Sequence, residues 1–378
     1  MIYFDNAATA KVNPKVLDTY VKLVNELIGN PSSVHGLGLK ASNYMEIARK
    51  QIGKTLKLKD KNILFTSGAS ESNNLGIKGY VRRNAKLGNH IITTAVEHPS
   101  VLRVFEELAL EGFSVTYLSV DKNGQIDLDE LKRSLRPDTL LVSIMGVNNE
   151  TGVIFPVEKI SEIIHKNSTA VFMSDLTQAI GKIKLDLNIF DMFSMSSHKV
   201  MGLKSSGLFV YNSNLHIKPL IDGGSQEMGL VAGTDNAPLD CSLATAIRLI
   251  TASFDERYKK TTALKNYLID ELSKLGSEEI LFISPKDNCS PFILNFSLLH
   301  YKASVLVEAL SKRGVYVSTR SACSSHAKGS SYVIKALGYS DHIGSNAIRL
   351  SFEGSESLEQ GKEFMRILLD ELEKLERI

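Results

Sequence analysis

Short apolar runs alternate with amphipathic segments between about residues 60 and 212 of the chain. The apolar runs have the length of strands and lie at 62–66, 90–94, 114–118, 140–145, 170–174, 192–195 and 207–211. Segments with a helical spacing of apolar residues lie between the earlier runs, at 70–84, 99–111 and 157–165. Because strands that alternate with helices pair in parallel and are covered on both faces, this region predicts an α/β domain with a mainly parallel seven-stranded sheet between helices.

The pattern changes after about residue 236. A long helical tract at 244–275 comes first, and strand-like or helical segments follow at 292–296, 303–312 and 347–352 and from Leu358 onward. This order of elements predicts a smaller α+β domain. We expect residues 14–245 to form the large domain, and residues 1–13 and 246–378 to form the small one.

Charge and hydropathy exclude several classes of partner. The 44 basic and 42 acidic residues give a formal charge of +2 and are interleaved along the chain, which argues against nucleic acid or an anionic membrane as the main partner. No apolar run approaches the ~20 residues of a membrane span. The start, MIYFDNAATA, lacks the basic region of a secretory signal. We therefore expect a cytoplasmic protein.

Three cysteines are present, Cys241, Cys289 and Cys323. Their odd number and the absence of a CxxC pair exclude a disulfide framework and a zinc ribbon. Cys323 lies among small polar residues that predict a loop reaching solvent, where the nearby Arg320 and Lys328 would favour the thiolate. We favour a reactive Cys323 over a structural one, and a metal pair with His326 lacks further ligands, so no metal site is predicted.

Lys199 ends the segment Ser-Ser-His-Lys directly after an apolar strand. At the end of a buried strand an ammonium group is desolvated, which lowers its pKa and suits it to a covalent bond with a carbonyl compound. A lysine taken alone is most often a surface residue. The assignment therefore depends on other residues.

Asp175 is one such residue, because it ends another apolar strand and is followed by Thr177 and Gln178. A carboxylate at this depth could keep a pyridine nitrogen protonated, as it does beside a lysine that carries pyridoxal phosphate. The alternative for Asp175 is a helix N-cap.

Four further segments follow predicted strands or lie within one. Thr66–Asn74, TSGASESNN, opens a helix whose N–H groups favour an anion, unless it is only an ordinary helix start. His98, held extended by the next proline, could lie against a flat cofactor or be an exposed loop residue. Asn148 is either a site residue or a turn residue. Arg349, among apolar strand residues, could bind a substrate carboxylate or form a structural ion pair.

Taken together and in this order, the segments resemble the cysteine desulfurases of the class V aminotransferase family. The resemblance runs from Tyr3 to the last helix and covers essentially the whole chain. Its motifs are YFDNAAT, GNPSS with the following histidine, TSGASESNN, EHPSVL, SIMGVNNETG, SDLTQAIGK, SSHK, a glycine segment that ends in Gly-Thr, SACSS and AIRLS.

The resemblance implies a fold-type I transferase that depends on pyridoxal phosphate (PLP) and works as a homodimer. Lys199 would carry the cofactor and Asp175 would pair with its ring nitrogen. His98 would stack on the ring and move protons, and Gln178 would meet the phenolic oxygen. The phosphate would bind Ala69, Ser70, Ser196 and His198, with Thr234 reaching in from the neighbouring subunit. Asn148, at the cofactor, and Arg349 would receive the substrate carboxylate.

The activity implied by the resemblance is that of a PLP-dependent cysteine desulfurase. Cys323 would take the sulfur of L-cysteine as a persulfide, L-alanine would leave, and the sulfur would pass to an acceptor protein. The SxxSAC context around Cys323 resembles the subgroup that serves iron–sulfur assembly and tRNA thiolation. The alternatives are a selenocysteine lyase or another PLP-dependent lyase of sulfur amino acids, and a weakly active paralogue that acts as a sulfur-relay partner.

The chain departs from the family pattern at several positions. Ser70 replaces a threonine, Leu176 replaces an alanine, and Arg320 replaces a glycine. The largest change is at Met228 and Val231, where the family usually has arginine. Losing two cations near the dimeric cofactor site bears on phosphate affinity, partner docking or specificity.

Overall fold

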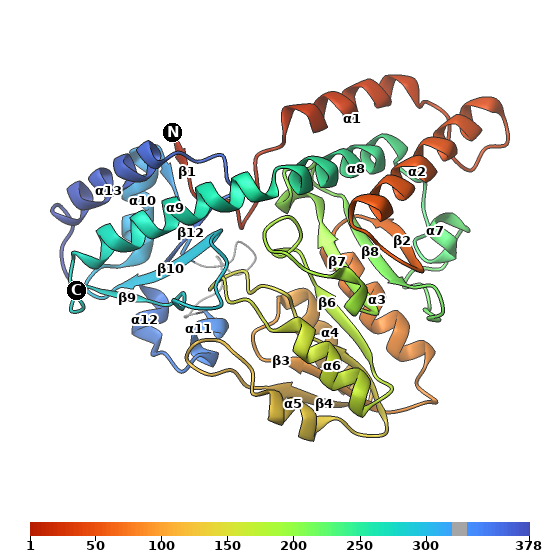
Figure 1. Cartoon of the computed structure of the whole chain (residues 1–378), viewed down its shortest axis with the longest axis horizontal. Helices are drawn as coiled ribbons and strands as arrows, with labels where there is room; N and C mark the ends of the chain where they lie inside the picture. Colours follow the sequence, from red (N-terminus) through yellow and green to blue (C-terminus); the bar gives the residue numbers. More distant parts are fainter. Residues whose placement is uncertain (320–330) are drawn as a thin grey trace.

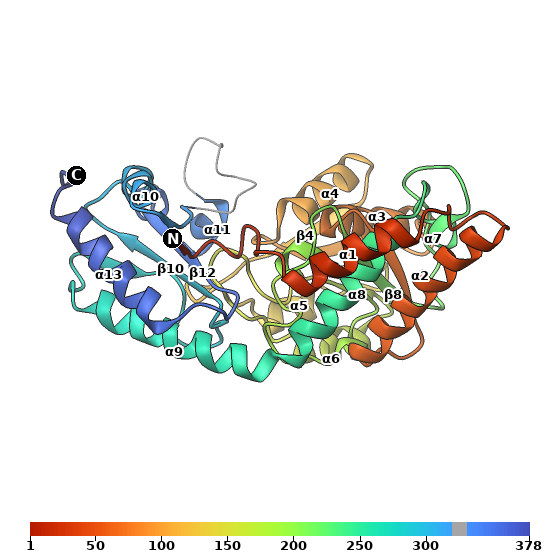
Figure 2. The ribbon, with the colours of Figure 1, turned by 90° about the horizontal axis from the view of Figure 1, so that it is seen from above.

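A computed structural model describes residues 1–319 and 331–378. The chain forms two lobes that lie side by side, with the N-terminus on the lobe that contains the C-terminal elements (Figure 1). Figure 2 shows the same division at right angles to this view. Cys323 and its neighbours at 320–330 lie outside the described residues.

The large lobe is built on a sheet of seven strands. In spatial order the strands are β2 (Lys61–Thr66), β8 (Gly207–Asn212), β7 (Met192–Ser196), β6 (Val171–Asp175), β5 (Thr139–Ser143), β3 (His90–Thr94) and β4 (Ser114–Leu118). Only β8 runs antiparallel to its neighbours β2 and β7, and the other pairs are parallel. The predicted mainly parallel seven-stranded sheet is therefore confirmed, with strand bounds within two residues of the prediction.

Helices cover both faces of this sheet because successive strand residues point in opposite directions. Leu208 and Val210 of β8 pack toward one core, and Phe209 and Tyr211 pack toward the other. The first core holds α1 (Pro14–Glu26), α2 (Gly36–Thr55), α5 (Leu128–Ser134), α6 (Val157–Asn167) and α8 (Ala237–Ala252). The second holds α3 (Ala69–Arg83) and α4 (Pro99–Leu110). The short α7 (Gln226–Gly229) lies beside β2 at the edge of the sheet.

The small lobe has a core of its own around a three-stranded antiparallel sheet. The sheet consists of β9 (Ile280–Phe282), β10 (Ile293–Leu298) and β12 (Ala347–Ser351), and the main helices are α9 (Phe254–Ser273), α10 (Ala303–Lys312) and α13 (Leu358–Leu372). The N-terminal β1 (Ile2–Tyr3) pairs with β11 (Val315–Tyr316), and Ile2 and Phe4 belong to this core. Two short helices, α11 (Tyr332–Ala336) and α12 (Asp341–Ser345), precede β12.

One predicted element differs in the structure. The helical tract expected at 244–275 is two helices, α8 and α9, which meet at Ser253. The Ser253 hydroxyl donates to the Leu249 carbonyl, a bond that competes with helix continuation. The break lets α9 turn from the large lobe into the small one (Figure 1). Among the described residues, no helix is both long and apolar enough to span a membrane.

Candidate active site

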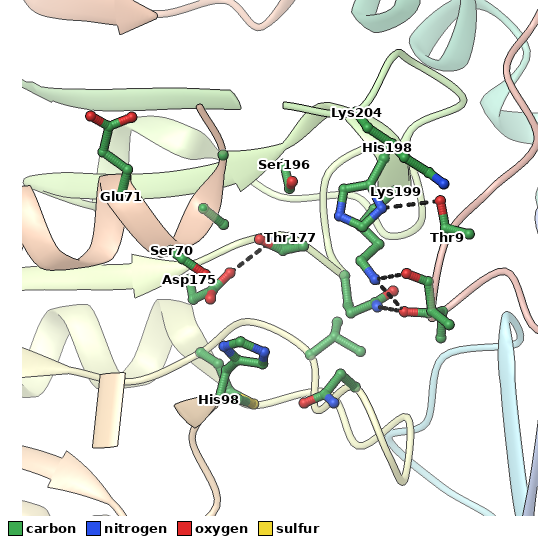
Figure 3. A pocket seen from close by; sticks show the side chains of 18 of the residues that line it. Thr9, Ser70, Glu71, His98, Asp175, Thr177, Ser196, His198, Lys199 and Lys204 are labelled. Atoms are coloured by element: carbon green, nitrogen blue, oxygen red, sulfur yellow. Dashed lines mark hydrogen bonds between the residues drawn. The ribbon is translucent and has the colours of Figure 1, made fainter. Parts of the chain in front are cut away.

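A cavity of about 530 Å³ lies at the carboxyl ends of the central strands, where both lobes meet. The large lobe supplies most of its wall, and the small lobe supplies Arg349 of β12 and the N-terminal segment at Ala7, Ala8 and Thr9. Nine of the predicted site residues line it: Ala69, Ser70, His98, Asp175, Gln178, Ser196, His198, Lys199 and Arg349. Figure 3 shows Asp175 and His98 on one side of the cavity and Lys199 with Thr9 on the other.

Lys199 lies in a single 3₁₀ turn, Ser197–Lys199, that directly follows β7. Its Nζ donates to the Ala7 carbonyl at 2.6 Å and also to the Ala8 carbonyl. The lysine thus reaches across the cavity from the large lobe to the N-terminal segment (Figure 3). The expectation of a surface lysine does not apply, because the side chain points into the site.

Asp175 ends β6 and is buried at the base of the cavity. Its Oδ1 accepts from the Thr177 backbone N–H at 2.9 Å, and its Oδ2 accepts from Asn73 Nδ2 at 2.8 Å. Turns and no helix follow it, so the structure does not support the alternative of a helix N-cap. The two hydrogen bonds fix the carboxylate in one orientation.

His98 is half-buried and forms the N-cap of α4. Its Nδ1 accepts from the Ser100 backbone N–H at 3.2 Å and contacts the Ser100 hydroxyl at 2.8 Å. Since Nδ1 is an acceptor, the neutral ring carries its proton on Nε2. Asn73 donates to the Ser100 hydroxyl at 2.9 Å as well as to Asp175. One buried amide therefore holds Asp175 directly and His98 through Ser100.

The first turn of α3 forms another part of the wall. Gly68 precedes this helix, and within residues 1–319 and 331–378 no side chain caps its first N–H groups, so these donors remain for a ligand. A Cβ on Gly207 would lie 2.6 Å from the Cα of Gly68, so position 207 requires glycine. Gly68 itself has φ 147°, a conformation that residues other than glycine rarely adopt. Ser196, His198 and Lys204 line the cavity on the same side. Burial and the neighbouring Lys199, Lys204 and Lys182 lower the pKa of His198 to about 4, so that imidazole is neutral at pH 7.

The sequence matches the class V aminotransferase family over residues 2–360. A NifS/IcsS protein homolog of Lactobacillus delbrueckii subsp. bulgaricus is 42% identical over 97% of this chain and 95% of its own length. The mitochondrial cysteine desulfurase of Saccharomyces cerevisiae is 40% identical over 92% of this chain and 70% of its own length. A solved structure of a NifS-like protein has a TM-score of 0.92 and 35% identity, with 99% of this chain and 100% of that chain covered. The chain belongs to the cysteine desulfurase family of the class V aminotransferases.

Enzymes of this family depend on PLP, so the family, the fold type and the cofactor predicted from the sequence are confirmed. The cavity of this family member fits that cofactor. Its lysine, Lys199, matches the aldehyde of PLP, and its fixed carboxylate, Asp175, matches the pyridine nitrogen. The open N-terminus of α3 matches the phosphate. Three buried polar atoms of residues that line the cavity, Asn149 Oδ1, Thr177 Oγ1 and Arg349 Nε, have no hydrogen-bond partner among the described residues.

Asn148 does not line the cavity. Its Oδ1 accepts from the N–H groups of Glu150 and Thr151, and its Nδ2 donates to the Val96 carbonyl at 3.0 Å. The side chain is buried within its own turn, as the alternative of a turn residue implied. The neighbouring Asn149 lines the cavity instead. Two asparagines in succession gave no signal in the sequence to distinguish them.

Thr234 is exposed and lies outside the cavity of its own chain. Earlier in the same glycine segment, Glu227 is anchored to the large lobe. Its carboxylate accepts from Arg49 at 2.8 Å and from the Phe65 backbone N–H at 2.7 Å. Met228, at one of the two lost arginine positions, is 55% exposed. Met228 therefore contributes to the protein surface, whereas Val231 is partly buried against the second core, and neither lines this chain's cavity.

The two described cysteines lie outside the cavity. Cys241 is buried, and desolvation together with Asp240 raises the pKa of its thiol to about 12. Such a thiol is inert as a nucleophile at neutral pH. Cys289 lies 3.1 Å from Lys265 Nζ, on a loop beside Thr151.

Sequence reasoning missed the contacts made by the N-terminal segment. The Ala7 and Ala8 carbonyls accept from Lys199, and Thr9 contacts His198 at 3.2 Å. Backbone acceptors have no signature in residue type. The only available signal was the motif YFDNAAT itself, which matches the family without indicating what it contacts.

Proposed function

We propose that this protein removes the sulfur of L-cysteine with the help of PLP, releases L-alanine, and passes the sulfur through Cys323 to an acceptor protein. The observation that carries the proposal is the convergence of Lys199, Asp175, His98 and Arg349 on one cavity between the lobes. Spacing in the sequence separates these residues by up to 251 positions, and only the fold brings them together.

Each of these residues has a distinct task. Bound PLP supplies the electron sink that makes the Cα proton of an amino acid removable. Lys199 holds the cofactor through Nζ and afterwards serves as a base at Cα. Asp175, fixed by Asn73 and Thr177, holds a proton on the ring nitrogen. The His98 ring carries its proton on Nε2 and lies at the cavity wall. There it can donate this proton to the substrate carbon that loses the sulfur.

The remaining residues orient the cofactor and the substrate. Ala69 and Ser70 offer the N–H groups of α3 to the phosphate, with Ser196, His198 and Lys204 beside them. Asn149, in place of Asn148, and Arg349 would receive the substrate carboxylate. Thr234 would complete the phosphate site of a second copy, since it is exposed on its own chain. A homodimer is part of this proposal.

Described residues on either side of 320–330 form hydrogen bonds with residues near the cavity. Ser318 exchanges two backbone hydrogen bonds with Arg349, and Ser331 donates its hydroxyl to Glu150, next to Asn149. These anchors support delivery of Cys323 to the substrate side of the site. In the transfer, the Cβ–Sγ bond of cysteine breaks and an S–S bond forms on Cys323, while the carbon gains the proton that makes alanine.

Arg349 is the residue that we expect to bind the carboxylate of the substrate. The side chain is 1% exposed, Nη2 contacts Asp5 at 3.1 Å, and Nη1 donates to the Asn149 carbonyl at 2.9 Å. Asp5 and the backbone thus orient the guanidinium, and Nε has no partner among the described residues. The structural ion pair and the substrate role are therefore compatible.

The variants Arg349→Ala and Arg349→Lys are expected to keep the cofactor and to bind L-cysteine at least about 30-fold more weakly, since a buried charge pair that loses one partner costs on the order of 2–5 kcal/mol. Titration of the cofactor absorbance with L-cysteine measures this affinity. If both variants unfold or lose the cofactor, Arg349 is only a structural partner of Asp5. If they titrate like the parent, the carboxylate binds elsewhere.

A turnover assay tests the proposed function. Purified protein with PLP, L-cysteine and a thiol reductant should yield sulfide and alanine in equal amounts, and more rapidly than it converts cystine. A strong preference for selenocysteine would favour the selenocysteine lyase. If the protein binds an acceptor protein but does not turn over L-cysteine, the relay partner is favoured. The acceptor, an iron–sulfur scaffold or a tRNA-thiolation protein, and the cytoplasmic location stay predictions.

A further inference from the structure

Lys182 is a second lysine buried beneath the active site, and no step described above uses it. It lies in the turn that follows β6 and is 1% exposed, although it is one of the largest side chains in the interior. Its Nζ donates to Gln178 Oε1 at 2.5 Å. The cavity wall contains Gln178 and does not contain Lys182.

A continuous series of hydrogen bonds connects Lys182 with Lys199. Because Lys182 donates to Oε1 of Gln178, the amide nitrogen of Gln178 must face the other way. This Nε2 donates to the Ala7 carbonyl at 3.1 Å, and the same carbonyl accepts from Lys199 Nζ at 2.6 Å. Lys182 Nζ at Oε1 and the Ala7 carbonyl at Nε2 thus agree on one orientation of the amide.

Packing alone does not account for a lysine at this position. Burying an amine among apolar residues costs free energy that an unbranched apolar side chain would not cost. The charged groups around Lys182 are mostly of its own sign: Lys199, Arg257 and Arg349, with Glu353 opposing them. Burial and these cations keep the pKa of Lys182 well below its usual range. The residue is therefore retained at a cost to stability.

We propose that Lys182 is a positioning residue that fixes Gln178 with its amide nitrogen toward the cofactor. The inference rests on the proposed function and on the role that the family resemblance implies for Gln178, at the phenolic oxygen of PLP. A donor at that oxygen stabilises its negative charge and so weakens the hold on the proton that the cofactor shares with Lys199. Without Lys182 only the Ala7 carbonyl holds the amide, so the donor at the phenolic oxygen is less firmly fixed and that proton is held more tightly.

The variant Lys182→Met tests the proposal, because methionine keeps the length of the side chain and removes the amine. We expect the pH midpoint of the visible absorption of bound PLP to rise by about one unit. Thermal stability should stay at the parent value or increase, since a desolvated amine has been removed. Lys184→Met is the matched control, because Lys184 lies two positions further on and makes an exposed ion pair with Asp255 and a cation–π contact with Phe254, neither of which involves a residue that lines the cavity. Its midpoint should equal that of the parent.

Further variants distinguish positioning from a general effect of charge. Gln178→Ala should raise the midpoint by itself, and adding Lys182→Met to Gln178→Ala should give no further rise. The inference is overturned if Lys182→Met or Gln178→Ala leaves the midpoint at the parent value, or if the effect of Lys182→Met persists undiminished beside Gln178→Ala. A parent protein that binds no PLP would overturn the proposed function as well. If the parent binds PLP and absorbs visible light, but the variants have the same pH midpoint as the parent, only this inference is overturned.

Discussion

The Cys323→Ser variant is expected to bind PLP and L-cysteine like the parent and to release sulfide at least about 100-fold more slowly. Lys199 and Arg349 make the contacts with cofactor and substrate, so binding does not need the thiol. The sulfur has no nucleophile to receive it once the thiol is replaced by a hydroxyl. Absorbance changes on adding L-cysteine, followed by a sulfide assay, separate the two steps.

Cys241→Ser is the matched control for this experiment. Cys241 is buried away from the cavity with a raised thiol pKa, so its variant should turn over like the parent. Cys289→Ser should also retain turnover, because that cysteine contacts Lys265 and not the cavity. Normal turnover by Cys323→Ser together with an inactive Cys289→Ser would show that the wrong cysteine was chosen.

The second large effect is expected for Lys199→Ala. This variant should lose the yellow colour of the bound cofactor and at least roughly 1,000-fold in turnover, since the group that both anchors PLP and moves the Cα proton is gone. In the parent protein, borohydride reduction and peptide mass mapping should place the pyridoxyl group on Lys199.

The exposed Lys122 provides a control on the same sheet-bearing lobe. Lys122→Ala should keep the colour and the turnover of the parent. A pyridoxyl label on any other lysine, Lys182 and Lys204 included, would contradict the assignment of Lys199.

Much of the large lobe was predictable because its strands are apolar and regularly spaced. Each of the seven predicted runs lies within a strand or overlaps one, since a strand buried on both faces must be apolar throughout. The break between α8 and α9 was not predictable, because Ser253 is compatible with a helix interior and its hydroxyl bond to Leu249 depends on the fold.

The site was predictable where residue type reports chemistry. Lys199, Asp175, His98 and Arg349 follow or lie in apolar strands, and these positions indicated their place before the structure did. Asn149 and Lys182 were missed for different reasons. Asn148 and Asn149 are identical in type, and only the turn determines which one faces the cavity. Lys182 looks like a surface lysine in the sequence, and its burial depends on the packing of both lobes.

The measurement that most directly tests the central claim is to follow the sulfur atom itself. The protein is mixed with an equimolar amount of L-cysteine labelled with a heavy sulfur isotope, without reductant, and its peptides are mapped by mass. We expect one labelled sulfur on the peptide that contains Cys323, together with one equivalent of L-alanine. Label on the Cys241 or Cys289 peptide, or alanine without any protein-bound sulfur, would contradict it.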